Sequence, residues 1–426
     1  MIDFSNYYSL GANDAETASA DELFEKIRSE KESGAIGYYT IVEHKKELLE
    51  AIGDYIKNNS LLKKGKIKNV VVIGIGGSSL GAKAIDRLLH YKKKRHYPEL
   101  HFLENCDPIN LRDSLKAIKK NDTIFIIISK SGTTIETTSL FKYIIKKYAI
   151  KLGEKKTKDR LIAITDTGSP LAKFASKNNI AQFNIPQNIG GRFSVLTHVG
   201  LVPLALAGFN VEKLIDGARE FEDSFFARGQ DHLLHKALYL YENYPKKRIN
   251  VLFAYASLFA YLNDWFVQLW GESLGKKDKD GNSFGMTPVG LTGSVDQHSF
   301  LQLIMEGPKD KSLTFLKIKN FESSTHIPDF SLDFLESTDY VNGHLFSELI
   351  NAQCDATMEA VIQQKDIPVD AISFDRLNHK NVGALIYYFE LLTSAMGILF
   401  NINTYDQPGV ELGKQILKNK FPGGKR

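Results

Sequence analysis

The sequence contains two cysteines, almost no net charge and no long uninterrupted apolar run, and each of these shortages excludes a kind of site or a class of protein. Cys106 and Cys354 lie far apart, with no CxxC or Cys/His ligand spacing, so neither a disulfide framework nor a zinc site is indicated and a reducing cytoplasm fits. The 54 Lys and Arg nearly balance the 50 Asp and Glu, so the protein as a whole has no strong positive electrostatic field that would attract nucleic acid or an acidic membrane. The longest apolar stretch, residues 199–209, is short and contains Pro203, and the N-terminus lacks a basic start and an apolar core. We therefore expect a cytoplasmic protein that neither spans a membrane nor binds nucleic acid.

What the chain does have is short apolar, β-branched runs that alternate with amphipathic helical patterns. Such runs are typical of parallel strands that are covered on both faces. They occupy residues 70–73, 101–103, 123–128 and 161–164, and then 250–253, 313–318 and 370–374. Residues 211–244 read as helices without a strand, which places a boundary near Phe209. The 426 residues therefore predict an α/β fold of two doubly wound domains with parallel sheets, residues 56–208 and 209–396, with an N-terminal helical segment (1–55) and a C-terminal segment (397–426).

A glycine-rich loop, residues 74–81, follows the first predicted strand and leads into a helix. Free amides at a strand's carboxyl end and at the positive end of a helix favour a phosphate site. A dinucleotide-binding fold is the alternative, because Gly74 and Gly76 match its fingerprint and Glu104 ends the next strand. Ser79 stands where the third glycine of that fingerprint belongs, and a purely structural role for the loop stays open.

The third predicted strand ends in a second polar loop, residues 129–134, again before a helix. A cap for that helix needs one hydroxyl. This loop offers those of Ser129, Ser131, Thr133 and Thr134, with the ammonium of Lys130 beside them. We interpret it as a phosphate-binding loop, and the nucleotide P-loop motif is absent from the sequence.

Glu272 is a candidate general base near the end of a predicted helix over residues 256–275. Its spacing from Trp265 and Leu269 places it on the apolar face, so we expect its carboxylate to point inward. Partial burial and the negative helix end both disfavour the anion, which makes a carboxylate more basic. An exposed ion pair with Lys276, one turn later, is the alternative.

His298 lies in the first turn of a helix predicted from a capping box formed by Ser294 and Gln297. The positive helix end favours a neutral imidazole, which can relay protons. A structural histidine beside Phe300 is the alternative reading.

Arg192 follows Gly190 and Gly191, so the backbone can approach a ligand while the guanidinium faces a developing oxyanion. Near the C-terminus, Gln407 and Lys414 are seven residues apart and share one face if the segment is helical. Periodicity alone does not separate that segment from an ordinary surface helix.

Together these segments resemble the glucose-6-phosphate isomerase family, in the shorter form found in bacteria and archaea. The motifs occur in order along nearly the whole chain: GIGGSSLG at 74–81, SKSGTT at 129–134, NIGGRFS at 188–194, ESLGK at 272–276, DQHSF at 296–300 and YDQPGVELGK at 405–414. Two departures, Leu274 for a common asparagine and Pro408 for an aromatic residue, flank the matched functional residues.

The resemblance implies two sugar isomerase domains with the substrate between them, and a homodimer with a shared active site. It implies that Glu272 moves a proton between C1 and C2 and that Arg192 stabilises a cis-enediolate. His298 and Lys414 match ring-opening residues, and in this family the histidine comes from the neighbouring subunit. The implied substrate contacts are Gly77, Ser78, Ser129, Lys130, Ser131, Thr133, Thr134 and Gln407.

The reaction so implied is the reversible isomerisation of glucose 6-phosphate and fructose 6-phosphate in glycolysis and gluconeogenesis, which needs no metal and no redox cofactor. A sugar-phosphate-binding regulator without activity is the first alternative, but Glu272, His298 and Lys414 are present and no basic recognition helix stands out. A nucleotide-dependent dehydrogenase is disfavoured by Ser79.

Overall fold

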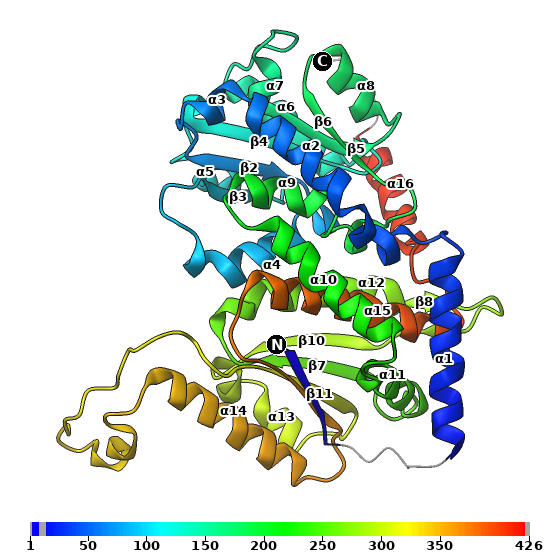
Figure 1. Cartoon of the computed structure of the whole chain (residues 1–426), viewed down its shortest axis with the longest axis vertical. Coiled ribbons are helices and arrows are strands. Elements are labelled where there is room, and N and C mark those ends of the chain that lie inside the picture. Colours follow the sequence, from blue (N-terminus) through cyan, green and yellow to red (C-terminus); the bar gives the residue numbers. More distant parts are fainter. Residues whose placement is uncertain (1, 8–13, 422–426) are drawn as a thin grey trace.

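The computed structural model describes residues 2–7 and 14–421, which form two α/β lobes stacked one above the other (Figure 1). Each lobe is built on a five-stranded sheet. The helices are α1 (Asp14–Glu32), α2 (Lys45–Asn58), α3 (Ser60–Lys63), α4 (Leu80–Leu89), α5 (Pro108–Ser114), α6 (Ile135–Lys147), α7 (Thr157–Arg160), α8 (Pro170–Lys177), α9 (His198–Leu206), α10 (Val211–Phe226), α11 (His232–Glu242), α12 (Ala260–Leu274), α13 (Leu301–Met305), α14 (Phe346–Ile362), α15 (His379–Phe400) and α16 (Glu411–Lys420).

The first sheet is entirely parallel, with the strand order β3-β2-β4-β5-β6. Its strands are β2 (Asn69–Ile73), β3 (Glu99–Leu103), β4 (Thr123–Ile128), β5 (Leu161–Asp166) and β6 (Ala181–Ile185). All six residues of the central strand β4 are buried, as a sheet covered by helices on both faces requires. The carboxyl ends of β2 and β4 carry the two polar loops of the sequence.

The second sheet has the order β1-β12-β11-β7-β10, and only β1 runs antiparallel to its neighbour. Its strands are β1 (Ile2–Asn6), β7 (Ile249–Ala254), β10 (Thr287–Thr292), β11 (Lys311–Ile318) and β12 (Val369–Phe374). A small hairpin, β8 (Lys276–Lys277) and β9 (Ser283–Phe284), stands apart from it. The predicted doubly wound α/β fold is confirmed, with one correction: the segment 1–55, expected to be helical, also supplies the edge strand β1.

A layer of buried helices separates the two sheets, with α15 packed against α10, α11 and α12 (Figure 1). By length and composition α15 could cross a membrane. Of its most apolar stretch of 18 residues, 83% is buried inside the protein, as expected for a core helix. Glu390 of α15 is fully buried, and neither carboxylate oxygen has a hydrogen-bond partner among the described residues. Burial raises the pKa of Glu390 well above its ordinary range.

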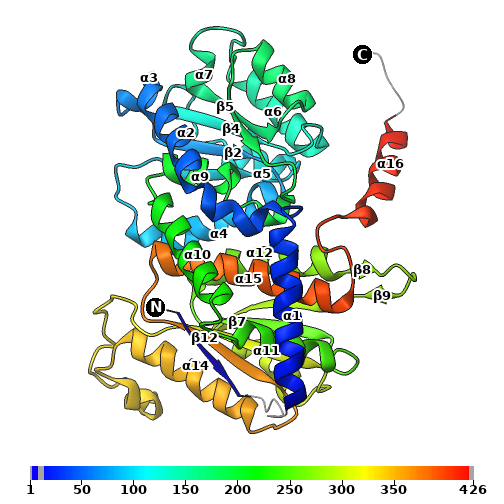
Figure 2. The same ribbon diagram turned by 45° about the vertical axis from the view of Figure 1, so that its right-hand side comes forward.

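Two segments extend from this body. Residues 320–345 form a long loop with one short 3-10 helix ahead of α14, seen at the lower left of Figure 1, in which Phe334 is 96% and Tyr340 80% exposed. On another side, α16 stands off from the lobes (Figure 2), and all its residues but one are exposed. Both segments present apolar side chains to solvent.

Candidate active site

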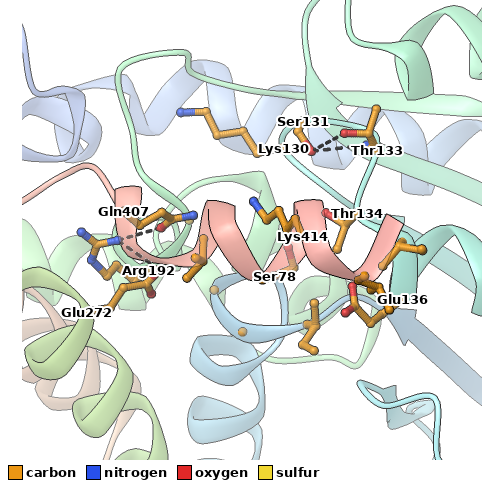
Figure 3. Close-up of a pocket in the computed structure, with 18 of the residues that line it drawn as sticks. Ser78, Lys130, Ser131, Thr133, Thr134, Glu136, Arg192, Glu272, Gln407 and Lys414 are labelled. Carbon is orange, nitrogen blue, oxygen red and sulfur yellow. Dashed lines mark hydrogen bonds and ion pairs between the residues drawn. The ribbon is translucent and has the colours of Figure 1, made fainter. Parts of the chain in front are cut away.

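A cavity of about 1270 Å³ opens between the two lobes, at the carboxyl ends of β2 and β4 and beneath α16. Ten of the residues predicted for the site line it: Gly77, Ser78, Lys130, Ser131, Thr133, Thr134, Arg192, Glu272, Gln407 and Lys414 (Figure 3). Ser129 and His298 are not part of its lining. Residues more than 300 positions apart in the sequence therefore meet at one site.

The loop 129–134 presents its hydroxyls to the cavity in two different ways. Thr133 Oγ1 donates to Ser131 Oγ at 3.1 Å on the cavity side. Ser129 is 2% exposed, and its Oγ lies 2.9 Å from Thr134 Oγ1 and accepts from the Gly132 amide. Ser129 thus holds the shape of the loop from beneath. Thr134 precedes α6 but its side chain makes no cap hydrogen bond, so simple helix capping does not explain these hydroxyls.

Lys130 extends away from Ser131 and Thr133 (Figure 3). Its Nζ donates to the backbone oxygens of Gln187 at 2.7 Å and Ile189 at 2.8 Å. Burial lowers the pKa of the Lys130 ammonium, and the Asp166 carboxylate opposes that effect. The ammonium is therefore engaged with the loop that carries Arg192.

The first glycine loop lies against the turn before Arg192. A methyl group on Gly77 would overlap the Gly191 carbonyl and would come within 2.6 Å of the Arg192 amide nitrogen, so only glycine fits there. Directly after β3, the Glu104 carboxylate forms an ion pair with Lys83 Nζ at 2.5 Å and accepts a hydrogen bond from Ser79 Oγ at 2.7 Å. The carboxylate that a dinucleotide site would use for a ribose is thus already occupied.

Arg192 is buried, with 2% of its surface exposed, and protein groups surround its guanidinium. Nε donates to Ser273 Oγ at 2.6 Å and Nη1 to Gln407 Oε1 at 3.0 Å. Nη2 donates to the backbone oxygens of Thr404 and Asp406. Burial lowers the pKa of the guanidinium, and Glu272 and Asp406 oppose that shift, so the group stays charged. The sequence predicted this arginine and, as a substrate contact, Gln407, but not the backbone oxygens of Thr404 and Asp406.

Glu272 of α12 faces the cavity, and its side chain is 25% exposed. Its Oε1 lies 3.5 Å from Arg192 Nη1, and its Oε2 accepts from Gln268 Nε2 at 3.1 Å. Lys276 instead pairs with Asp406 Oδ1 at 2.8 Å, so the alternative pairing of Glu272 with Lys276 does not form. Sequence reasoning missed Gln268, although it precedes Glu272 by one helical turn and also lines the cavity.

Lys414 reaches the cavity from α16 (Figure 3). Its Nζ forms an exposed ion pair with Glu411 at 2.6 Å. Gln407 lies on the preceding segment and is held by Arg192. The predicted helix over this region begins at Glu411, after a short 3-10 turn, so Gln407 lies outside it.

His298 is exposed, at the end of a one-turn 3-10 helix, Val295–His298. The predicted capping box is wrong, because Ser294 makes no side-chain cap hydrogen bond. Gln297 instead donates to Tyr255 Oη at 2.9 Å and to Thr357 Oγ1, partners distant in the sequence. Within this chain His298 therefore stands outside the cavity.

The cavity combines three chemical elements. The paired hydroxyls after β4 and the glycine-rich loop after β2 suit a phosphate. A carboxylate and a fixed guanidinium at the other end suit proton transfer next to a developing oxyanion. In the part of the chain that the structure describes, no three His, Cys, Asp or Glu side chains are grouped as metal ligands.

Comparisons with known proteins agree with this geometry. A family model described as phosphoglucose isomerase matches residues 39–422. The glucose-6-phosphate isomerase of Campylobacter jejuni is 44% identical over 395 residues, which cover 92% of this chain and 94% of that protein. The glucose-6-phosphate isomerase of Methanocaldococcus jannaschii is 37% identical over 421 residues, which cover 97% and 93%.

Solved structures show the same arrangement of both lobes. A Thermus thermophilus protein described as hypothetical matches with a TM-score of 0.89 at 30% identity, over 99% of this chain and 100% of that one. A glucose-6-phosphate isomerase from Chlamydia trachomatis matches with a TM-score of 0.81 over 99% of this chain and 88% of that one, at 21% identity, a likeness that shows the fold.

Proposed function

This chain belongs to the phosphoglucose isomerase family, and from that premise we propose that it interconverts glucose 6-phosphate and fructose 6-phosphate, as in glycolysis and gluconeogenesis. The observation that carries the proposal is the placement of Glu272 and Arg192 in one cavity with two loops suited to phosphate. The reaction moves a proton between neighbouring carbons, so it needs a base, a stabilised oxyanion and an anchored substrate.

The anchor in this proposal is the phosphate. Ser131, Thr133 and Thr134 supply hydroxyls, and Gly77 and Ser78 supply the facing loop. Binding energy from the phosphate, which does not react, holds C1 and C2 beside the catalytic groups. The buried hydroxyl of Ser129 supports this loop from below, which makes its role indirect.

The chemistry in this proposal falls to Glu272, Arg192 and Lys414, with Gln407 as a further contact. Glu272 takes the proton from one carbon and returns it to the other, and the guanidinium of Arg192 stabilises the cis-enediolate between these steps. Lys414 assists ring opening, and Gln407 contacts the sugar. The hydrogen bonds that hold Arg192 in place support its role, because a donor fixed beforehand need not reorganise during the reaction.

The test is conversion of fructose 6-phosphate to glucose 6-phosphate by purified protein in a chelating buffer. Glu272→Gln should lower kcat by at least about 10²–10⁴-fold, the usual contribution of general acid–base catalysis. Glu136→Gln is the matched control, because Glu136 lines the same cavity and has no assigned role. Near-native turnover in Glu272→Gln would refute the assignment, and binding without turnover in the unchanged protein would favour a regulator.

We further propose that the working unit is a homodimer in which His298 serves the partner's site. The exposed position of His298 outside its own cavity supports this, as do the apolar side chains exposed on the loop 320–345. Mixing Glu272→Gln with His298→Asn protein tests it. Random exchange of subunits should restore about a quarter of the native activity, because half of the dimers are mixed and each has one intact site. No restoration in demonstrably mixed dimers would show that each chain uses its own histidine.

We place the protein in the cytoplasm as part of the same proposal. Cys106 is exposed and Cys354 is buried, and both are free thiols, which fits a reducing compartment.

A further inference from the structure

The side chain of Lys130 joins two loops that are not neighbours in the sheet. Lys130 follows β4, whereas its partners Gln187 and Ile189 follow β6, and β5 lies between these two strands. The side chain therefore crosses the carboxyl end of β5, where Asp166 lines the cavity. Two hydrogen bonds, of 2.7 and 2.8 Å, fix its far end.

The loop that receives Lys130 leads directly to Arg192. On one side the Gly37 amide donates to the Asn188 oxygen at 3.0 Å, and on another the backbone of Gly191 lies against Gly77. Lys130 holds the two carbonyl groups on either side of Asn188. Of these supports, only Lys130 comes from the hydroxyl-bearing loop 129–134.

We propose that Lys130 is a positioning residue that couples occupancy of the phosphate loop to the placement of Arg192, and that it is not itself a phosphate ligand. This inference rests on the proposed function. To reach a phosphate, the ammonium would have to leave two backbone carbonyl groups without their donor, which is unfavourable. The Asp166 carboxylate also attracts the Lys130 ammonium, which further favours its present position.

Such coupling gives the binding energy of the phosphate a route to the reacting carbons. A phosphate that orders residues 129–134 also fixes the position of Lys130 and, through it, the turn that carries Arg192. Interactions remote from the reacting atoms then contribute to kcat as well as to binding.

The first test compares Lys130→Met, which keeps the aliphatic stem, with Thr133→Val, which removes a hydroxyl from the loop. For Lys130→Met we expect kcat to fall by about 10–100-fold, as displacement of a catalytic group does, while the inhibition constant of inorganic phosphate changes by less than about threefold. Thr133→Val should show the opposite pattern: phosphate inhibition should weaken and KM should rise by more than kcat falls. A tenfold or greater loss of phosphate inhibition in Lys130→Met would make Lys130 a ligand and overturn the proposal.

A rescue experiment separates positioning from damage to the fold. Lys130→Cys treated with 2-bromoethylamine regains an ammonium at nearly the original reach, and kcat should recover. Wild-type protein treated in the same way controls for alkylation of the exposed Cys106. Failure of an alkylated, folded protein to recover kcat would count against the proposal. Lys130→Gln replaces Lys130→Met if the latter does not fold.

Hydrogen exchange tests the coupling without relying on activity. Inorganic phosphate should slow amide exchange over residues 187–193 in the wild type, and this protection should be lost in Lys130→Met although phosphate still binds. Protection retained in Lys130→Met would refute the coupling. Absence of isomerase activity in the wild type would refute the proposed function instead, and the exchange result would still decide the role of Lys130.

Discussion

Gly77 offers the sharpest test of how tightly the loop 74–81 must fit against the turn of Gly190 and Gly191 that precedes Arg192. In Gly77→Ala the added methyl would lie 2.6 Å from the Arg192 nitrogen and closer still to the Gly191 carbonyl group, whereas ordinary contacts of such a carbon begin near 3.4 Å. All of these neighbours are backbone atoms, so no side chain can rotate away. The nearest of these atoms, the Gly191 carbonyl carbon, would lie at 2.2 Å, so one loop must move by about 1.2 Å to restore an ordinary contact.

That displacement acts on the backbone of Arg192 and on the loop that faces the phosphate. A misplacement of about 1 Å can lower a rate by about 10²-fold, because reacting groups must be held within a few tenths of an ångström. We expect kcat of Gly77→Ala to fall by about 30–100-fold. The overlap involves only backbone atoms of two loops outside the strands, so the sheets should stay intact and thermal unfolding should remain cooperative.

The assay is steady-state isomerisation, with Gly53→Ala and Gly409→Ala as controls, because a methyl group at either position meets no atom within 4 Å. Both controls should keep kcat within about threefold of the wild type. If Gly77→Ala also retained native kcat, the contact with Gly191 would not position Arg192 and the reasoning would be refuted.

Two further perturbations test other parts of the structure. Glu390→Gln should stabilise the protein increasingly above about pH 4.3, because the folded carboxyl keeps a proton that the unfolded chain releases, so rising pH favours unfolding of the wild type. Urea unfolding free energies of the two proteins should diverge by up to about 1.4 kcal/mol per pH unit, and parallel profiles would contradict a protonated Glu390. Lys276→Met and Asp406→Asn should each lower kcat, since their ion pair holds the segment that binds Arg192. In a double-mutant cycle the two losses should not add, and simple additivity would show that the pair acts through separate contacts.

The fold was predictable where strands are buried on both faces. The runs at 70–73, 123–128 and 313–318 correspond to interior strands, most of whose residues are apolar and buried. The strands that pattern analysis missed, β1, β6 and β10, all lie at sheet edges. Edge strands are partly exposed, so β6 alternates polar and apolar residues and β10 tolerates Pro288. Their sequences lack the continuous run that identified the others.

The residues of the site were predictable where residue type and the neighbouring sequence alone indicate a chemical role. Residue type and loop position identified Glu272, Arg192 and the hydroxyls of 129–134. The partners of these groups were not predictable, because Thr404 and Asp406 approach Arg192 from another part of the chain through backbone atoms that carry no residue signature. The same holds for Gln297, whose partners Tyr255 and Thr357 replaced the local capping box.

The hydrogen bonds from Arg192 to the backbone of Thr404 and Asp406 also have a consequence for folding during synthesis. The Thr404 carbonyl that receives the Arg192 guanidinium lies 212 residues further along the chain. At about 5–20 residues per second, a ribosome needs roughly 10–40 s to synthesise that stretch. During this interval the first sheet can form while the arginine still lacks its acceptors. The emerging chain would thus acquire its architecture well before its catalytic competence.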